Sequence, residues 1–386
     1  AGRAKEITGI TVVDPYTLRI ETDKPRPYFL GKLTYSVNAV LPKGTPATEI
    51  RDVAGMIGTG PFKAEKHVPD QVTVLAANKE YHEGAPLLER LEVLVIKDAQ
   101  ARLNKYQAGE VDLVTLERSQ IAGAREDPKL SKELSFDERA GFTYFTLSLS
   151  QYKPFKDVRV RRALAMSLDV DKIVNQYLGG NNRPAHGTVP PGVPGFREQT
   201  NHLKFDPAAA RKLLAEAGYP GSKGLPPLEL SFREQTPEVR IVAEAAASMW
   251  KEHLNFDVKL RTLEWRTLLE RRNAGQIPLL YWGWVADYLD PENFLSFLFA
   301  TYPYAPENRS GYSNPQFDAL CREADSIFDQ ERRLELYAKA EDILLQDAGC
   351  IPVYFQRNAD LVKPYVKGLR RTLFGYMPHT KVTLER

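Results

Sequence analysis

The sequence contains few of the residues that bind metals or form cross-links. Its 386 residues include two cysteines, Cys321 and Cys350, with no CxxC pair. This excludes a zinc ribbon, an iron–sulfur cluster and a disulfide-based scaffold. A single disulfide between the two cysteines stays open, because both lie beside predicted helices. The six histidines are scattered, and no two have the spacing of metal ligands on a helix. We therefore expect no metal and no other cofactor.

The motifs of covalent catalysis and of phosphate binding are absent as well. The sequence has neither a G-x-S-x-G nucleophile elbow nor a G-x-x-x-x-G-K-[ST] loop. The glycines of residues 58–61 (GTGP) precede a proline and a strand pattern rather than a helix, so we expect a turn there. A peptide hydrolase would need a metal or a nucleophile constellation, and the sequence contains neither. The expectation is a protein that is not an enzyme.

The chain also lacks an excess of charge and a long apolar run. The 52 Lys and Arg residues nearly balance 50 Asp and Glu residues, for a formal net charge of +2. Nucleic-acid binders need a basic surface, so that function class is excluded. No run of about 18 apolar residues occurs, so no segment is expected to span a membrane. With 43% hydrophobic residues, the chain is long enough for two or three globular domains.

The N-terminal residues carry no signal peptide, since residues 1–6 lack an apolar stretch. Residues 7–13 and 17–21 instead predict two strands joined by a turn at Asp14-Pro15. A chain that enters a hairpin this early is expected to be part of a longer one.

Strand and helix patterns alternate along the rest of the chain, which predicts a mixed α/β sheet rather than a bundle or a sandwich. Helices are expected to begin at Asp157 and at Asp206-Pro207, the second ending at Gly218. Two late helices read as an αα-hairpin. The predicted strands are residues 71–76, 91–96, 143–149, 228–232, 258–263, 279–284 and 351–355, and the other predicted helices are residues 99–108, 238–253, 315–328 and 331–346.

Residues 281–294 (YWGWVADYLDPENF) are the most distinctive segment for function, because carboxylates and aromatic rings alternate there. Asp287 follows the predicted strand 279–284, and ligands of α/β proteins bind at such strand ends. A carboxylate beside large rings can hold a cation. Asp290 is expected to cap a helix that starts at Pro291. Nearby, residues 264–272 combine Trp265 with several arginines, and either form a solvated helix face or bring Arg272 to a carboxylate in a cleft.

Several segments, in order along the chain, resemble bacterial solute-binding proteins of ATP-binding-cassette (ABC) importers, specifically the large peptide/nickel family. The oligopeptide-binding branch is the most similar. The segments are 58–63 (GTGPFK), 78–81 (NKEY), 109–112 (GEVD), 153–164 (KPFKDVRVRRAL), 213–219 (LLAEAGY), 264–267 (EWRT), 284–288 (WVADY), 352–354 (PVY) and 358–364 (NADLVKP).

The resemblance implies an α/β, two-lobed periplasmic-binding-protein-like (type II) fold with mixed sheets, truncated at its N-terminus. Residues 1–145, completed by 350–386, would form the larger lobe, and residues 146–349 the other. The expected function is capture of short peptides in an inter-lobe cleft and delivery to ABC permease subunits in the membrane, with a periplasmic or extracytoplasmic location. Alternatives are an oligosaccharide, opine or metal-chelate cargo, or no binding by an incomplete lobe.

The resemblance also implies roles for individual residues. Asp287 would bind the α-ammonium group of a peptide, and Trp265, Arg272 and Trp284 would line side-chain pockets, with Tyr288 and Tyr281 beside them. Tyr281 stands where some oligopeptide binders carry an arginine that meets a peptide carboxylate. Recognition of the peptide C-terminus is therefore open. Sugar rings, the rival cargo, would stack on Trp265, Trp282 and Trp284.

Overall fold

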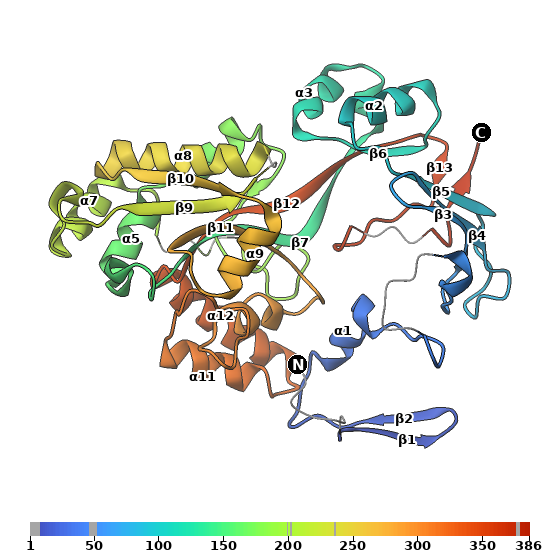
Figure 1. Ribbon diagram of the computed structural model, residues 1–386, viewed down its shortest axis with the longest axis horizontal. Coiled ribbons are helices and arrows are strands. Elements are labelled where there is room, and N and C mark those ends of the chain that lie inside the picture. The colour runs from blue at the N-terminus through green and yellow to red at the C-terminus, as the bar shows by residue number, and fades with distance from the viewer. Residues whose placement is uncertain (1–7, 46–51, 199, 201–202, 235–236, 376–378) are drawn as a thin grey trace.

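A seven-stranded mixed sheet forms the centre of the computed structural model, which describes residues 8–45, 52–198, 200, 203–234, 237–375 and 379–386 (Figure 1). The strand order is β10-β9-β11-β7-β12-β6, and β8 pairs with β12. The strands are β6 (Leu113–Thr115), β7 (Leu134–Leu147), β8 (Arg183–Pro184), β9 (Leu228–Arg233), β10 (Val258–Leu263), β11 (Leu279–Val285) and β12 (Cys350–Val362).

Two long antiparallel strands, β7 and β12, connect the two lobes of the molecule (Figure 1). Near one end they lie beside β6 and the helices α2 (Ala99–Ala108), α3 (Arg118–Glu126) and α4 (Leu130–Glu133). Near the other end β7 pairs with β11. The register of β12 shifts twice on the way, between Pro352 and Tyr354 and between Phe355 and Arg357. Such irregularities bend a strand pair, which suits a connection between lobes.

Four apolar clusters form among the described residues, and the smallest, around Leu263, Leu268, Ile277 and Leu280, packs against Trp282. The other three are larger. The first lies under α5 (Val158–Met166), α7 (Pro207–Glu216) and α8 (Pro237–Leu254), around the fully buried Trp250. The second lies between the sheet and the hairpin of α11 (Pro315–Ala324) and α12 (Gln330–Gln346). The third lies under α2–α4. The indole Nε1 of Trp250 donates to the Leu164 carbonyl at 3.1 Å, so this large core side chain leaves no polar atom unpaired.

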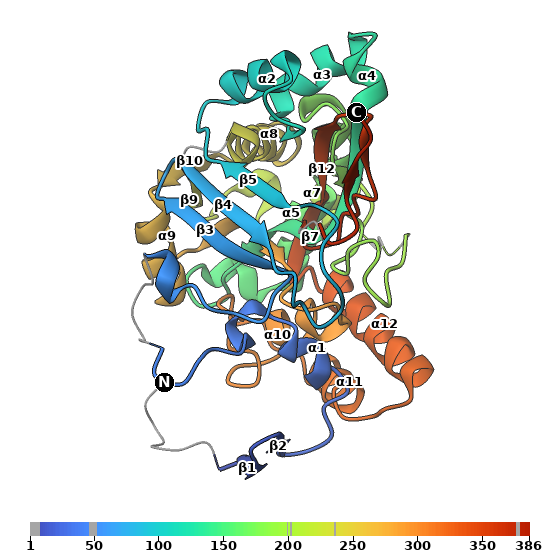
Figure 2. The same ribbon diagram turned by 90° about the vertical axis from the view of Figure 1, so that its right-hand side faces the viewer.

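The N-terminal part forms smaller units around the first lobe. The hairpin of β1 (Ile10–Asp14) and β2 (Thr17–Ile20) stands apart from the body in both views (Figures 1 and 2). The short helix α1 (Phe29–Leu33) follows. A separate antiparallel sheet contains β3 (Phe62–Val68), β4 (Val72–Ala77) and β5 (Arg90–Leu94). The C-terminal segment returns here, through β13 (Val366–Lys367) and β14 (Thr383–Leu384) and a backbone bond from Leu87 to Thr380.

Most predicted elements are confirmed, with four corrections. The strand expected at 351–355 continues to Val362 as the long strand β12. The strand expected at 143–149 begins nine residues earlier, since β7 starts at Leu134 in a polar stretch that gives no strand pattern. The helix expected to reach residue 328 ends at Ala324. The disulfide left open is not formed: Cys321 and Cys350 are free and buried. Residue 7 of the first predicted strand lies outside the described residues. Within the described ranges, no helix is both long and apolar enough to cross a bilayer.

Candidate functional site

Three neighbouring strands of the central sheet, β9, β10 and β11, end on the same side of that sheet. Strand β9 runs parallel to both β10 and β11, so the three chains leave the sheet on the same side. Arg233 ends β9, Trp265 comes two residues after β10, and Asp287 comes two residues after β11. Ligands of open α/β sheets bind outside such strand ends. We refer to Arg233, Trp265, Asp287 and their neighbours here as the strand-end site.

Asp287 is held half-buried at this site by a buried asparagine. The Asp287 backbone N–H donates to Asn293 Oδ1 at 3.0 Å, and the same oxygen accepts Trp284 Nε1 at 3.1 Å. Burial raises the pKa of the Asp287 carboxyl, while a hydrogen bond from Tyr35 lowers it. The positive charge of Lys32 also lowers this pKa, and its influence is the smallest of the three. The carboxylate can therefore accept a cation from a ligand.

Two arginines and two tryptophans contact one another in series in this region, and we call them the Arg–Trp stack. The rings of Trp265 and Trp282 lie parallel, with centroids 5.5 Å apart. The guanidinium of Arg233 lies 4.7 Å from the Trp265 centroid, and that of Arg272 lies 4.5 Å from the Trp282 centroid. Each guanidinium over an indole face is attracted by the ring quadrupole, so the stack holds its own geometry.

The N-cap of helix α9 determines where Trp265 and Arg272 of the Arg–Trp stack lie along the chain. Glu264 accepts hydrogen bonds from the backbone N–H groups of Arg266 and Thr267, so helix α9 (Trp265–Asn273) begins at Trp265. Two turns later α9 presents Arg272, which is buried and pairs with Glu307 at 2.7 Å. The solvated face is wrong for Arg272, which is buried and meets the carboxylate of Glu307 in this chain. It is right for much of the segment, because Trp265, Arg266 and Glu270 are exposed.

Tyr281 is separated from the other predicted residues. Its side chain is buried in the first core, 5.0 Å from Phe145 between ring centroids, and its hydroxyl donates to Thr143 at 2.9 Å. Burial raises the pKa of Tyr281 far above its ordinary value. Because side chains alternate along β11, Tyr281 faces the core while Trp282 faces the stack.

Trp284 precedes Asp287 by three residues, and Tyr288 follows it directly. Trp284 is partly buried against Phe297, with centroids 5.5 Å apart. Tyr288 is buried, donates its hydroxyl to Glu292, and stacks on Tyr28 of the N-terminal part at 6.2 Å. The structure therefore brings Trp265, Arg272, Trp284, Asp287 and Tyr288 into one region.

The N-terminal helix α1 docks on an acidic group next to this region. Lys32 lies 3.9 Å from Glu292 and over the rings of Tyr28 and Tyr288, at 4.8 and 5.4 Å. Beside these contacts, residues 22–32 and residues 292–306 together line a pocket of about 490 Å³. Asp290 caps the short helix η6 (Pro291–Asn293), as predicted, and also pairs with Arg333 at 2.9 Å.

Glu292 makes folding stability depend on pH. Burial raises its pKa from 4.5 to about 7, and Lys32 opposes this shift. Because the folded chain holds this proton more tightly than the unfolded chain, the stability it contributes is complete below pH 4.5 and is lost as the pH rises through about 7. Relative to Glu292→Gln, we expect wild type to lose about 3 kcal/mol of unfolding free energy between about pH 4.5 and 8. Denaturant unfolding at several pH values measures this difference.

Lys32→Met provides the matched comparison for this prediction. Removing the charge that opposes the pKa shift of Glu292 should push that pKa higher and steepen the decline with pH. Identical pH profiles for wild type and Glu292→Gln would contradict the assignment.

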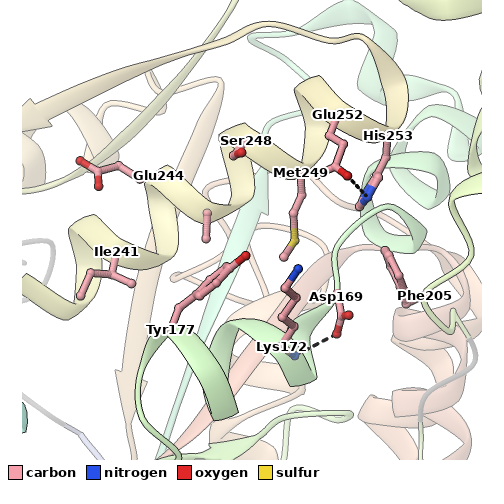
Figure 3. A pocket seen from close by; sticks show the side chains of 11 residues that line it. Asp169, Lys172, Tyr177, Phe205, Ile241, Glu244, Ser248, Met249, Glu252 and His253 are labelled. Atoms are coloured by element: carbon pink, nitrogen blue, oxygen red, sulfur yellow. Dashed lines mark hydrogen bonds and ion pairs between the residues drawn. The ribbon is translucent and has the colours of Figure 1, made fainter.

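Another pocket, of about 600 Å³, lies away from the strand-end site and contains none of the predicted residues. Helix α8 forms one wall, and the other wall is formed by residues 169–177, where α6 (Val170–Lys172) continues as a π-helix (Ile173–Tyr177). Lys172, Tyr177 and Met249 point toward its centre (Figure 3). Among the described residues, no three His, Cys, Asp or Glu side chains come together as a metal site.

Sequence reasoning missed five residues of the strand-end region: Lys32, Tyr35, Arg233, Asn293 and Glu307. Arg233 directly follows the predicted strand 228–232, and a position at a strand end is a usable signal. Asn293 lies within the distinctive segment 281–294. Nothing local to Lys32, Tyr35 or Glu307 indicates that they approach Asp287 or Arg272, because those contacts depend on the tertiary fold.

The two lobes joined by β7 and β12, with polar and aromatic residues at the ends of parallel strands, define the class: a two-lobed α/β protein of the periplasmic-binding-protein type. The sequence model of the bacterial extracellular solute-binding proteins, family 5 Middle, matches residues 2–305, and the chain belongs to this family.

Relatives of the chain are named for several different ligands. The chain is 32% identical over 373 residues to the periplasmic oligopeptide-binding protein OppA of Salmonella typhimurium, an alignment that covers 93% of this chain and 67% of the relative. It is 33% identical over 378 residues to the probable deoxycholate-binding periplasmic protein YgiS of Escherichia coli, covering 95% and 69%. It is 30% identical over 388 residues to heme-binding protein A of Haemophilus influenzae, covering 96% and 68%.

Solved structures confirm the predicted fold class. The unliganded open form of the periplasmic murein tripeptide-binding protein MppA aligns with a TM-score of 0.78 at 28% identity, covering 97% of this chain and 73% of the other. Haemophilus influenzae OppA in complex with the peptide RPPGFSPFR aligns with a TM-score of 0.78 at 27% identity, covering 98% and 75%.

Proposed function

We propose that this chain is the solute-binding component of an ABC importer and captures short peptides at the strand-end site. The observation that carries the proposal is the half-buried Asp287 carboxylate at the end of β11, whose pKa is raised by burial. A half-buried carboxylate that makes no ion pair with a described residue can bind an ammonium group with a charge-assisted hydrogen bond. Relatives named for oligopeptide and murein-peptide binding support the choice of a peptide.

The proposed mechanism is capture between two lobes followed by closure. Residues 1–145 with 350–386 would form one lobe and residues 146–349 the other, with β7 and β12 as the connection that bends. Peptide backbone would pair with exposed strand edges, which gives affinity without reading side chains. The closed form would deliver the peptide to permease subunits from a periplasmic or extracytoplasmic location, without catalysis.

Other cargoes are the second candidate, since relatives are named for deoxycholate and heme. Stacking of a sugar on Trp282 is hindered by the Arg–Trp stack, because Trp265 and Arg272 both contact this ring. Trp265 is 41% exposed, so part of its ring stays accessible although Arg233 and Trp282 contact it. Sugar binding at Trp265 is therefore left to the binding experiment.

Calorimetry with one ligand of each class tests the proposal. We expect unblocked peptides of three to six residues to bind, and a maltooligosaccharide, an opine, a metal chelate, deoxycholate and heme to bind far more weakly. Native mass spectrometry of the purified protein, which detects co-purified cargo by mass, provides an independent measurement. Binding of a non-peptide with no measurable affinity for any peptide would overturn the proposal.

A further inference from the structure

Building on the proposed function, we infer that Arg233 binds a carboxylate of the captured peptide. Asp287 and Arg233 would then hold opposite charges of one ligand at the same edge of the sheet. Arg233 would then favour peptides whose carboxylate lies within its reach when Asp287 holds the ammonium group.

Arg233 differs from neighbouring arginines in its contacts within the described part of the chain. It is exposed, and among the described residues it makes no ion pair with a carboxylate. By contrast, Arg261 pairs with Glu229, Arg266 with Glu270, and Arg272 with Glu307, at 3.0, 3.1 and 2.7 Å. Arg233 is therefore an available cation, whereas Arg272 is already neutralised by Glu307.

The Arg–Trp stack prepares Arg233 to bind a planar anion. Its guanidinium lies 4.7 Å from the Trp265 centroid, a cation–π attraction that does not depend on hydrogen bonds from the N–H donors of the group. A guanidinium presents these donors as a fork that matches a carboxylate in two parallel bonds. Because the indole already orders the side chain, less conformational entropy is lost when the anion binds.

The strand register sets the spacing of the two charges. Leu280 of β11 lies opposite Ser231 of β9, so Arg233 is level with Trp282. Asp287 is five positions further along the chain, an extent of at most about 17 Å at the usual rise of a strand. An extended peptide of five residues spans about the same distance. Because about 17 Å is an upper limit for the backbone, an extended peptide of four or five residues is long enough to reach Arg233 with its C-terminus while Asp287 holds its N-terminus.

The carboxylate has two possible sources, the C-terminus of the peptide or an acidic side chain, and two peptide pairs distinguish them. The first pair compares a neutral pentapeptide with its C-terminal amide. The second compares Glu with Gln at one position of the amidated peptide. Calorimetry measures each pair on the full chain as wild type, Arg233→Gln, Arg233→Lys and the control Arg261→Gln.

In wild type we expect loss of the carboxylate to weaken binding about 10- to 100-fold, the usual range for a hydrogen bond to a charged group. In Arg233→Gln the acid and the amide should bind alike, and Arg233→Lys should restore part of the difference. Arg261→Gln should behave as wild type. The loss on amidation should be largest for four or five residues in a length series from three to seven.

An equal loss on amidation in wild type and in Arg233→Gln, together with no Glu-to-Gln difference, would overturn the assignment of Arg233 while leaving peptide binding intact. Absence of any peptide binding by wild type would instead overturn the proposed function, and this inference with it. Because Arg233 is exposed, unchanged thermal midpoints of its variants verify that binding rather than folding is measured.

Discussion

Asp287→Asn is expected to weaken the binding of a peptide with a free N-terminus by about 30-fold to several thousand-fold. The substitution removes one partner of a charge-assisted hydrogen bond and leaves the ligand ammonium buried without a counter-charge, which typically costs about 2–5 kcal/mol. The thermal midpoint should change little, because the Asn293 contact at this position is made by the Asp287 backbone and not by its carboxylate.

N-acetylation of the peptide should cause a similar loss in wild type and little further loss in Asp287→Asn. Glu270→Gln, which removes a carboxylate exposed on α9 and paired with Arg266, is the matched control and should leave affinity unchanged. Because binding needs the ionised Asp287, whose pKa burial raises, affinity should also fall as the pH falls toward that pKa. An unaltered calorimetric affinity of Asp287→Asn would contradict the assignment.

Arg333→Met is expected to lower the free energy of unfolding by about 3–5 kcal/mol, the usual cost of leaving a buried charge unpaired. The Arg333 side chain is 2% exposed and holds Asp290 through Nη2 at 2.9 Å, while its Nε donates to the Ala324 carbonyl. Burial raises the pKa of Asp290, and Arg333 is the largest influence that opposes this shift. Without Arg333, the buried carboxyl must take up a proton or disrupt the packing beneath it.

The adjacent residue provides the control for this measurement. Arg332 is 45% exposed and pairs with Glu335 and Glu323 at the surface, so Arg332→Met should change stability by about 0–1 kcal/mol. Denaturant unfolding of both variants gives the comparison. Adding Asp290→Asn to Arg333→Met should recover part of the loss, because it removes the unpaired charge. Equal effects of the two single substitutions would contradict this account of the buried pair.

The sequence by itself determined features that depend on residues a few positions apart. Asp157 and Asp206 cap α5 and α7 as expected, with Pro207 at the first helical position. Gly218, which follows α7, has a φ of 92°, a conformation that glycine adopts at little cost. The strand at residues 279–285 and the place of Asp287 just beyond it were also readable, since alternation and turn chemistry are local.

Only the tertiary structure decided which side of each element faces the site. Alternation along β11 predicts that Tyr281 and Trp282 face opposite ways, but both residues are aromatic, so the pattern does not tell which face is the core. The strand order decides which face is the core. It places Tyr281 in the same apolar core as Phe145 and Trp250, and Trp282 on the opposite face in the Arg–Trp stack.

The partners of the charged residues were beyond the sequence for the same reason. Lys32 meets Glu292, Arg272 meets Glu307 and Arg333 meets Asp290, across separations of 260, 35 and 43 residues. By charge alone, any of the many carboxylates in the chain could have been the partner of these three residues. Which of them comes within reach is set by how the strands pair and how the helices pack on them. This packing gives Arg272 a carboxylate partner, whereas Arg233 meets none among the residues that the structure describes.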